Sequence, residues 1–168
     1  AAGKALGQAA AQLVNLEALL VSFEECINLN ATGVSEFSKA LATDTAATSL
    51  KELRLNFDAA TVLSSTEKAD VMFGHVGRMV AAHARNLEVI SLDLGDAQQS
   101  VAGVRALANG MGCLSGKPGF HVENFVDGTD GLQNTGLLYD QAKLCFRAGP
   151  SYSSQLGTHC LVCNTTAF

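Results

Sequence analysis

Residues 73–111 have the sequence FGHVGRMVAAHARNLEVISLDLGDAQQSVAGVRALANGM, in which apolar positions recur at alternating spacings of three and four. The recurring residues are Phe73, Val76, Val80, His83, Leu87, Ile90, Leu94, Ala97, Val101, Val104, Ala108 and Met111. This spacing is typical of one face of an α-helix. A single helix over residues 66–110 would be about 67 Å long at 1.5 Å per residue, so we expect an elongated molecule.

The local signals around this stretch support a long helix with one kink. Ser64-Ser65-Thr66-Glu67 matches the capping box that starts many helices. Glycines at positions 74, 77, 95 and 103 each weaken a helix interior by about 1 kcal/mol. We expect the kink at Leu94-Gly95-Asp96, and we expect the other glycines to allow close approach of a neighbouring helix.

The preceding residues also predict helices. Leu6, Leu13, Leu20 and Ile27 are spaced by seven, which is typical of a coiled-coil seam and predicts a helix over residues 4–28. Residues 34–63 are helix-prone but less regular, and a second capping-box match, Ser49-Leu50-Lys51-Glu52, predicts that a helix restarts there.

These patterns predict a mainly α fold, an elongated antiparallel helical bundle or coiled coil over residues 1–110. Apolar residues outside the seam, such as Met79, Val89, Leu92 and Leu107, imply three or more packed helices. The residues expected to form the packing seam are Leu13, Leu20, Ile27, Val80, Leu87, Ile90, Leu94, Val101 and Val104.

Residues 111–168 are rich in glycine and cysteine and are expected to form a loop-rich head within the same domain. We expect a short strand over 120–126 and a short helix over 137–146. Disulfides are expected to staple this head, and the odd number of cysteines suggests that the chain is a fragment. The candidate disulfide cysteines are Cys26, Cys113, Cys145, Cys160 and Cys163.

The cysteine cluster leaves two other possibilities open. His159-Cys160-Leu161-Val162-Cys163 could contribute to a zinc site or a redox pair, although no second ligand pair accompanies it. Of the helical histidines, His83 is expected to be buried or interfacial with a hydrogen-bond partner rather than a metal ligand. We therefore predict no metal and no cofactor.

Composition narrows the classes of function. A net charge of −5 without a basic run argues against nucleic-acid binding. No uninterrupted apolar stretch is long enough to span a bilayer. Neighbouring carboxylates such as Asp93 and Asp96 fit solvated faces, and no nucleophile or phosphate-loop motif is present. We therefore predict that the protein is not an enzyme.

Asn30-Ala31-Thr32 and Asn164-Thr165-Thr166 are candidate glycosylation sites, which would require the secretory pathway.

The alanine-rich start at 1–27, the seam at 73–111 and its exit at Ala108-Asn109-Gly110-Met111-Gly112-Cys113-Leu114-Ser115 resemble the African trypanosome surface-glycoprotein superfamily. The closest similarity is to the N-terminal domain of a variant surface glycoprotein. The resemblance covers most of the chain, although such domains are about twice as long. It implies a homodimeric coat glycoprotein on the extracellular face of the cell membrane. A GPI anchor outside this chain would hold it there, and it would shield the membrane from host antibodies.

Two other hypotheses stay open. The first is a surface receptor for a host serum protein, with Met79, Val89 and Leu92 as an exposed apolar patch. The second is a helical-bundle sensor that binds a small ligand in an enclosed pocket.

Overall fold

The computed structural model describes residues 2–24, 26, 29–43, 49–57, 66–94, 101–114, 117, 120–126, 137–140 and 145–148. Helices and strands alternate through most of this part of the chain. In order, the elements are α1 (Ala2–Ala11), β1 (Ala18–Ser22), α2 (Ala31–Leu41), β2 (Glu52–Asn56), α3 (Thr66–His83), β3 (Val89–Asp93), α4 (Val101–Met111), the 3-10 turn η1 (Gly112–Leu114), β4 (His121–Val126), β5 (Leu137–Asp140) and β6 (Cys145–Ala148).

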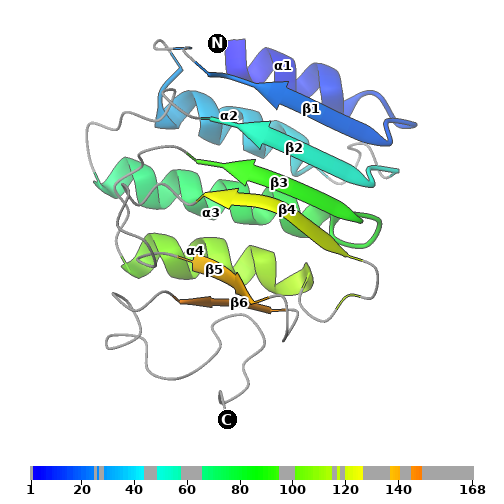
Figure 1. Ribbon diagram of the computed structural model, residues 1–168. Helices are drawn as coiled ribbons and strands as arrows, with labels where there is room; N and C mark the ends of the chain where they lie inside the picture. Colours follow the sequence, from blue (N-terminus) through cyan, green and yellow to red (C-terminus); the bar gives the residue numbers. More distant parts are fainter. Residues whose placement is uncertain are drawn as a thin grey trace.

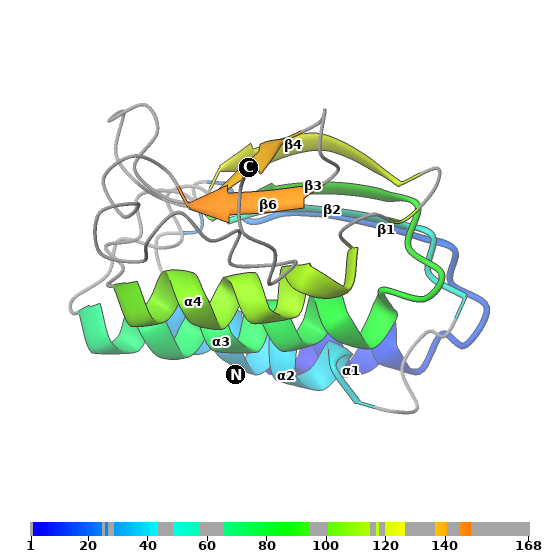
Figure 2. The same ribbon diagram turned by 90° about the horizontal axis from the view of Figure 1, so that it is seen from below.

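The four long helices lie on one side of a parallel sheet. Strands β1, β2, β3 and β4 are hydrogen-bonded in chain order, and each pair is parallel. Seen along the sheet, helices α1 to α4 form a single layer beneath the strands (Figure 2). Strands β5 and β6 form a separate antiparallel pair near α4 (Figure 1). Each strand and the helix beside it therefore make one unit, and the units stack side by side.

The stacked units share an internal sequence repeat. The three strand segments are NLEALLVSF at 15–23, SLKELRLNF at 49–57 and NLEVISLDL at 86–94. Strand register aligns them position by position, with Ala18 beside Glu52 and Glu52 beside Val89. In the second and third units, the inward positions of the pattern L-x-x-L-x-L are buried, and they are Leu50, Leu53, Leu55, Leu87, Ile90 and Leu92.

Equivalent backbone groups also repeat their hydrogen bonds. Before the strands, the N–H of Lys51 donates to the carbonyl of Glu17 over 2.8 Å, and the N–H of Glu88 donates to that of Lys51 over 2.6 Å. After the strands, Phe23 N–H donates to Asn56 and Phe57 N–H donates to Asp93. The same bonds recur in successive units, so the repeat is structural as well as a sequence pattern.

The core lies between the sheet and the helix layer. Alternation along β2 and β3 turns Leu53, Leu55, Ile90 and Leu92 toward the helices, where none is more than 2% exposed. Fully burying one such side chain stabilises the fold by about 1.5–3 kcal/mol. Phe23, Phe37 and Phe57 add an aromatic cluster, in which the rings of Phe23 and Phe57 are stacked with centroids 5.3 Å apart.

Small residues let neighbouring helices approach closely, as the glycines predicted. A Cβ on Gly77 of α3 would lie 2.8 Å from the Ala106 carbonyl oxygen of α4, and a Cβ on Gly7 of α1 would lie 2.6 Å from the Phe37 carbonyl oxygen of α2. Both contacts are with backbone, which cannot move aside easily. The short helix-to-helix spacing therefore depends on glycine at these positions.

The predicted rod is wrong, and with it the elongated helical bundle or coiled coil. Residues 66–110 contain α3, then strand β3, then α4, in an α/β fold. The capping box correctly marked the start of α3 at Thr66. The error arose at Leu87, Ile90 and Leu94, which are spaced by three and four residues. This spacing fits one face of a helix, but it also fits a strand segment whose inward positions are 87, 90, 92 and 94.

The predicted N-terminal coiled coil is also wrong. Leu13 follows the end of α1, and Leu20 lies on the outward face of β1, and both are exposed. Val80, Leu87, Ile90 and Leu94 are all buried, but they do not form one helical stripe. Val80 lies in α3, Leu87 in the segment before β3, Ile90 in β3, and Leu94 directly after β3. Val101 and Val104 lie in α4, and Ile27 lies outside the described residues. The capping box at 49–52 failed because Leu50 is a core residue that leads into β2.

The C-terminal predictions have mixed outcomes. The strand expected over 120–126 is confirmed as β4. The helix expected over 137–146 is wrong, since β5 and β6 occupy part of this range. Cys26 and Cys113 are exposed free thiols, so the disulfide prediction is wrong for them. The side chain of Cys145, together with Cys160, Cys163 and Asn164, lies outside the described residues.

Candidate binding face and strand-entry pocket

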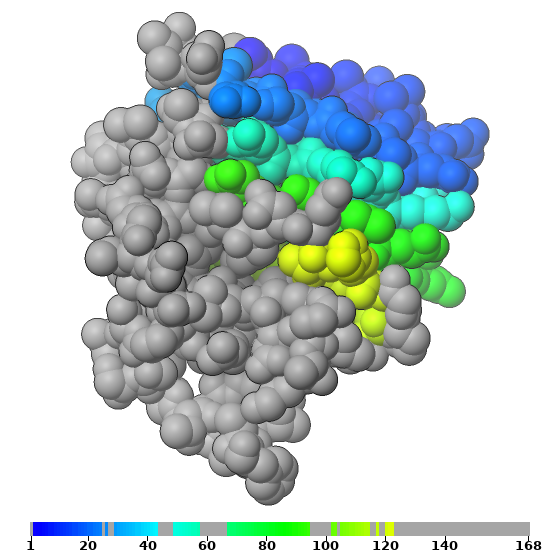
Figure 3. All heavy atoms as spheres, viewed as in Figure 1, coloured from blue at the N-terminus to red at the C-terminus, as the bar shows by residue number. Residues whose placement is uncertain are grey.

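The outward face of the sheet carries no helix in the described part of the chain. Register places its side chains in rows that run across the strands. One row is Ala18, Glu52, Val89 and His121, and a second begins Leu20, Arg54 and Ser91. Atoms of β1 to β4 are visible at this surface in the space-filling view (Figure 3). Below, we call this surface the open face.

The open face contains a shallow depression of about 390 Å³. Its outward-pointing lining residues are Leu20, Ser22, Arg54, Asn56, Ser91 and Asp93. The guanidinium group of Arg54 forms an ion pair with Glu52 of the same strand. Apolar, uncharged polar, acidic and basic groups thus lie within one surface. This composition is suited to binding the polar surface of another protein.

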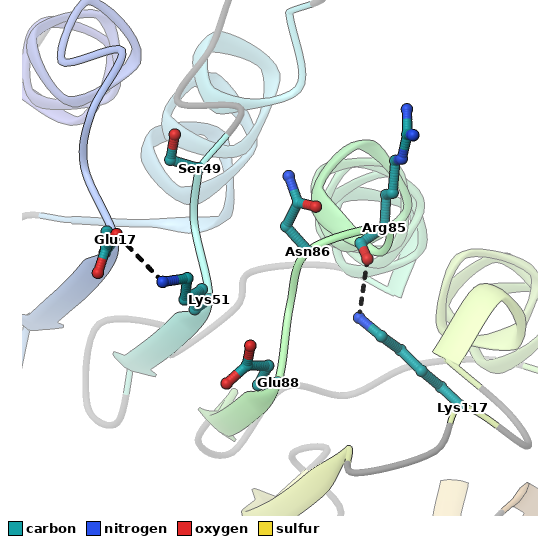
Figure 4. A pocket seen from close by; sticks show the side chains of 7 residues that line it. All are labelled: Glu17, Ser49, Lys51, Arg85, Asn86, Glu88 and Lys117. Atoms are coloured by element: carbon teal, nitrogen blue, oxygen red, sulfur yellow. Dashed lines mark hydrogen bonds and ion pairs between the residues drawn. The ribbon is translucent and has the colours of Figure 1, made fainter.

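A second pocket of about 610 Å³ lies where the chain enters the strands (Figure 4). Its lining residues are Glu17, Ser49, Lys51, Arg85, Asn86, Glu88 and Lys117. Glu17, Lys51 and Glu88 occupy equivalent positions in successive units, so charge alternates along this edge. Lys51 Nζ lies 3.1 Å from a Glu17 carboxylate oxygen. This exposed pair contributes little to stability because water screens it.

Lys117 has a structural role in the strand-entry pocket. Its ammonium group donates to the carbonyl oxygens of Ala84 at 2.8 Å and Arg85 at 3.1 Å, and also to that of Leu87. These carbonyls follow the end of α3, where a helix leaves acceptors unpaired and favours a positive charge. Burial lowers the pKa of Lys117, and the Glu88 carboxylate opposes that shift. We interpret Lys117 as a cap on α3 rather than as a nucleophile or base.

Lys117→Met is expected to lower the free energy of unfolding by about 1–3 kcal/mol, since three carbonyls lose their donor. Lys51→Met, in the same pocket, removes only an exposed ion pair, so it should change the free energy of unfolding by less than about 1 kcal/mol. Urea unfolding of both variants measures the difference. Equal effects would contradict a capping role for Lys117.

The C-terminus of α2 is capped in a similar way from the next unit. His83, at the end of α3, is 5% exposed, and its Nε2 lies 3.0 Å from the carbonyl oxygen of Leu41, the last residue of α2. With Nε2 protonated, the ring donates to that carbonyl. The prediction of a buried histidine with a hydrogen-bond partner is confirmed. Thus α2 and α3 are each capped at the C-terminus by a basic side chain from the unit that follows, His83 for α2 and Lys117 for α3.

Asn30 caps the start of α2, and its side-chain oxygen accepts a hydrogen bond of 3.1 Å from Gly33 N–H. It is exposed, so the sequon is accessible. A glycan would attach to the amide nitrogen and leave the capping oxygen in place. Glycosylation at this residue stays a prediction.

Asn30→Ala is expected to lower the free energy of unfolding by about 1 kcal/mol through loss of the cap. Asn30→Asp removes the sequon and keeps a capping oxygen, so it should cost far less. Thermal and urea unfolding of the unglycosylated variants would reveal this. A destabilisation by aspartate as large as that by alanine would argue against the cap.

The apolar patch proposed for a serum-protein receptor is not present as predicted. Met79 and Leu92 are fully buried in the core, and Val89 is half-buried on the open face. Among the described residues, no three His, Cys, Asp or Glu side chains are grouped so that they could hold a metal ion. The open face was not predicted from the sequence, although the repeat at 15–23, 49–57 and 86–94 is a signal for it.

Comparisons with protein-family models, curated proteins and solved structures found no match to this chain. Nothing in them links it to trypanosome surface glycoproteins. No helix in the described part is long and apolar enough to cross a membrane.

Proposed function

We propose that this protein is a non-enzymatic scaffold that binds a partner protein on the open face of its sheet. The observation that carries the proposal is a row-by-row array of outward side chains on four parallel strands, with all the helices that the structure describes on the opposite side. Stacked repeats create extended binding surfaces of this kind. The spacing L-x-x-L-x-L, with one strand and one helix per unit, resembles leucine-rich repeats. The present units are longer, with Leu16, Leu50 and Leu87 separated by 34 and 37 residues.

The chemistry of the open face favours protein over other ligands. Its depression is lined by groups of both charges together with Leu20. Phosphate-rich ligands need clustered basic residues, and Arg54 is already paired with Glu52. We expect the partner to be a folded protein. Its contact surface would have an apolar side chain that packs on Leu20, with polar side chains around it. Such mixed surfaces are typical of non-obligate interfaces.

An extracellular location, glycans on Asn30 and Asn164, and membrane attachment through an anchor outside this chain stay predictions. The receptor hypothesis agrees with a protein-binding scaffold, although its patch residues were wrong. The coat-glycoprotein hypothesis depended on a helical rod, so its main support is lost. The small-ligand sensor depended on a helical bundle, and the α/β fold removes that support.

Site-specific photo-crosslinking tests the proposal. A photoreactive amino acid at Ser91, on the open face, should capture one major partner in cells that express the protein natively. The same group at Lys68, exposed on α3, should not. With that partner purified, Ser91→Arg should raise the dissociation constant by about tenfold or more, and Lys68→Ala should leave it unchanged. Equal crosslinking from both positions, or equal affinities, would refute binding by the open face.

A further inference from the structure

Strands β2 and β3 begin with the same pair of hydrogen bonds. The N–H groups of Lys51 and Glu52 both donate to the carbonyl oxygen of Glu17, over 2.8 and 3.0 Å. At β3, the N–H groups of Glu88 and Val89 both donate to the carbonyl oxygen of Lys51, over 2.6 and 3.0 Å. Two backbone hydrogen bonds to the preceding unit thus hold the start of each strand.

Strand β4 begins differently. His121 N–H donates to the third unit over 2.8 Å, but the preceding Phe120 N–H donates over 3.3 Å to the carbonyl oxygen of Lys117, within its own segment. The strand register makes Gly119 the equivalent of the buried Leu87, so the sequence offers no side chain at that position. Phe120 is buried and gives β4 one apolar contact at its start. In the described sheet, β4 is paired with β3 alone, through an irregular register. The fourth strand therefore has a weaker attachment than β2 or β3.

The side chain of Lys117 compensates for this weaker attachment. Its ammonium group reaches three carbonyl oxygens of the third unit, those of Ala84, Arg85 and Leu87, and the bond to Arg85 is drawn in Figure 4. Lys117 itself belongs to the segment that enters β4. Hydrogen bonds from a charged donor are stronger than those between neutral groups. One side chain thus joins the segment before β4 to the end of α3.

We infer that Lys117 is a latch for the fourth strand: without its ammonium contacts, β4 separates from β3 while the first three units stay folded. Those units keep their own core, including the stacked rings of Phe23 and Phe57. Proteins commonly open in such sub-global units. Strand β4 carries His121 and the fourth column of the open face, so its release narrows that face. The latch is independent of the proposed partner protein, so it can fail while the Ser91 crosslinking result stands, and the reverse.

Amide hydrogen exchange of the full chain at increasing, sub-denaturing urea concentrations tests the latch. The amides of Val89 and His121 are a matched pair, because they align in register and each donates to the preceding unit. In the wild-type chain, the His121 amide should be at least about tenfold less protected than the Val89 amide. Its protection should also fall less steeply with urea, because release of one strand exposes less surface than global unfolding. Equal protection and equal urea dependence of the two amides would overturn the inference.

Three variants separate release of β4 from global unfolding. Lys117→Met should lower the protection of the His121 amide about 10- to 100-fold, whereas Lys51→Met, in the same pocket, should leave it within about fivefold. Asn30→Ala, made without a glycan, weakens a part of the fold that stays folded when β4 separates. It should lower the protection of the Val89 amide about fivefold and leave that of His121 unchanged. An unchanged His121 amide in Lys117→Met, or an equal loss at both amides in Asn30→Ala, would contradict the latch.

Discussion

Phe57→Ala is expected to lower the free energy of unfolding by about 3–5 kcal/mol, the usual cost of removing a buried phenylalanine. Phe57 is fully buried, is stacked on Phe23 of the first unit and makes an edge contact with Phe37 of α2 at 6.0 Å. The substitution therefore opens a cavity at the junction of two units. Urea unfolding followed by circular dichroism gives the value.

Val71→Ala is the matched control for this experiment. Val71 is apolar but 52% exposed on α3, so its truncation should change the free energy of unfolding by less than about 0.5 kcal/mol. If Phe57→Ala cost no more than Val71→Ala, the aromatic cluster between the first two units would not exist as described.

Gly77→Ala is expected to lower the free energy of unfolding by about 2–3 kcal/mol, although alanine is the better helix former. The added methyl group would lie 2.8 Å from the Ala106 carbonyl oxygen and 3.1 Å from that of Leu107, so α3 and α4 would have to separate. Chemical denaturation of the variant measures the loss.

Gly74→Ala, one turn earlier in the same helix, has the opposite expected sign. Its methyl group would meet only the Ala106 side chain at 3.7 Å, an ordinary contact. The gain in helix propensity should then raise the free energy of unfolding by up to about 1 kcal/mol. Stabilisation by both substitutions would show that α3 and α4 do not pack as closely as described.

Local signals predicted several elements but not their arrangement. The start of α3 at Thr66 and the strand β4 followed from capping and turn patterns. The path between α3 and α4 did not, because Leu87, Ile90 and Leu94 fit a helical face and a strand equally well. Burial of Leu92 between them distinguishes the two, since a residue two positions from Ile90 and Leu94 shares their face only in a strand.

The internal repeat was the signal that could have corrected the fold. Segments 15–23, 49–57 and 86–94 share leucines at equivalent positions, and their separation leaves room for one helix in each unit. Stacking these units predicts the open face, because alternate side chains of each strand point away from the helices. The caps from His83 and Lys117 could not be predicted, because each joins residues at least 30 positions apart.

Hydrogen-bond scalar couplings measured by NMR on a deuterated sample would test the stacked fold most directly. The fold predicts a coupling from the amide of Glu88 to the carbonyl of Lys51, and another from the amide of His121 to the carbonyl of Glu88. A continuous helix through residues 66–110 would instead couple the Glu88 amide to the carbonyl of Ala84. Observation of that local coupling, without the one to Lys51, would contradict the parallel sheet and the open face with it.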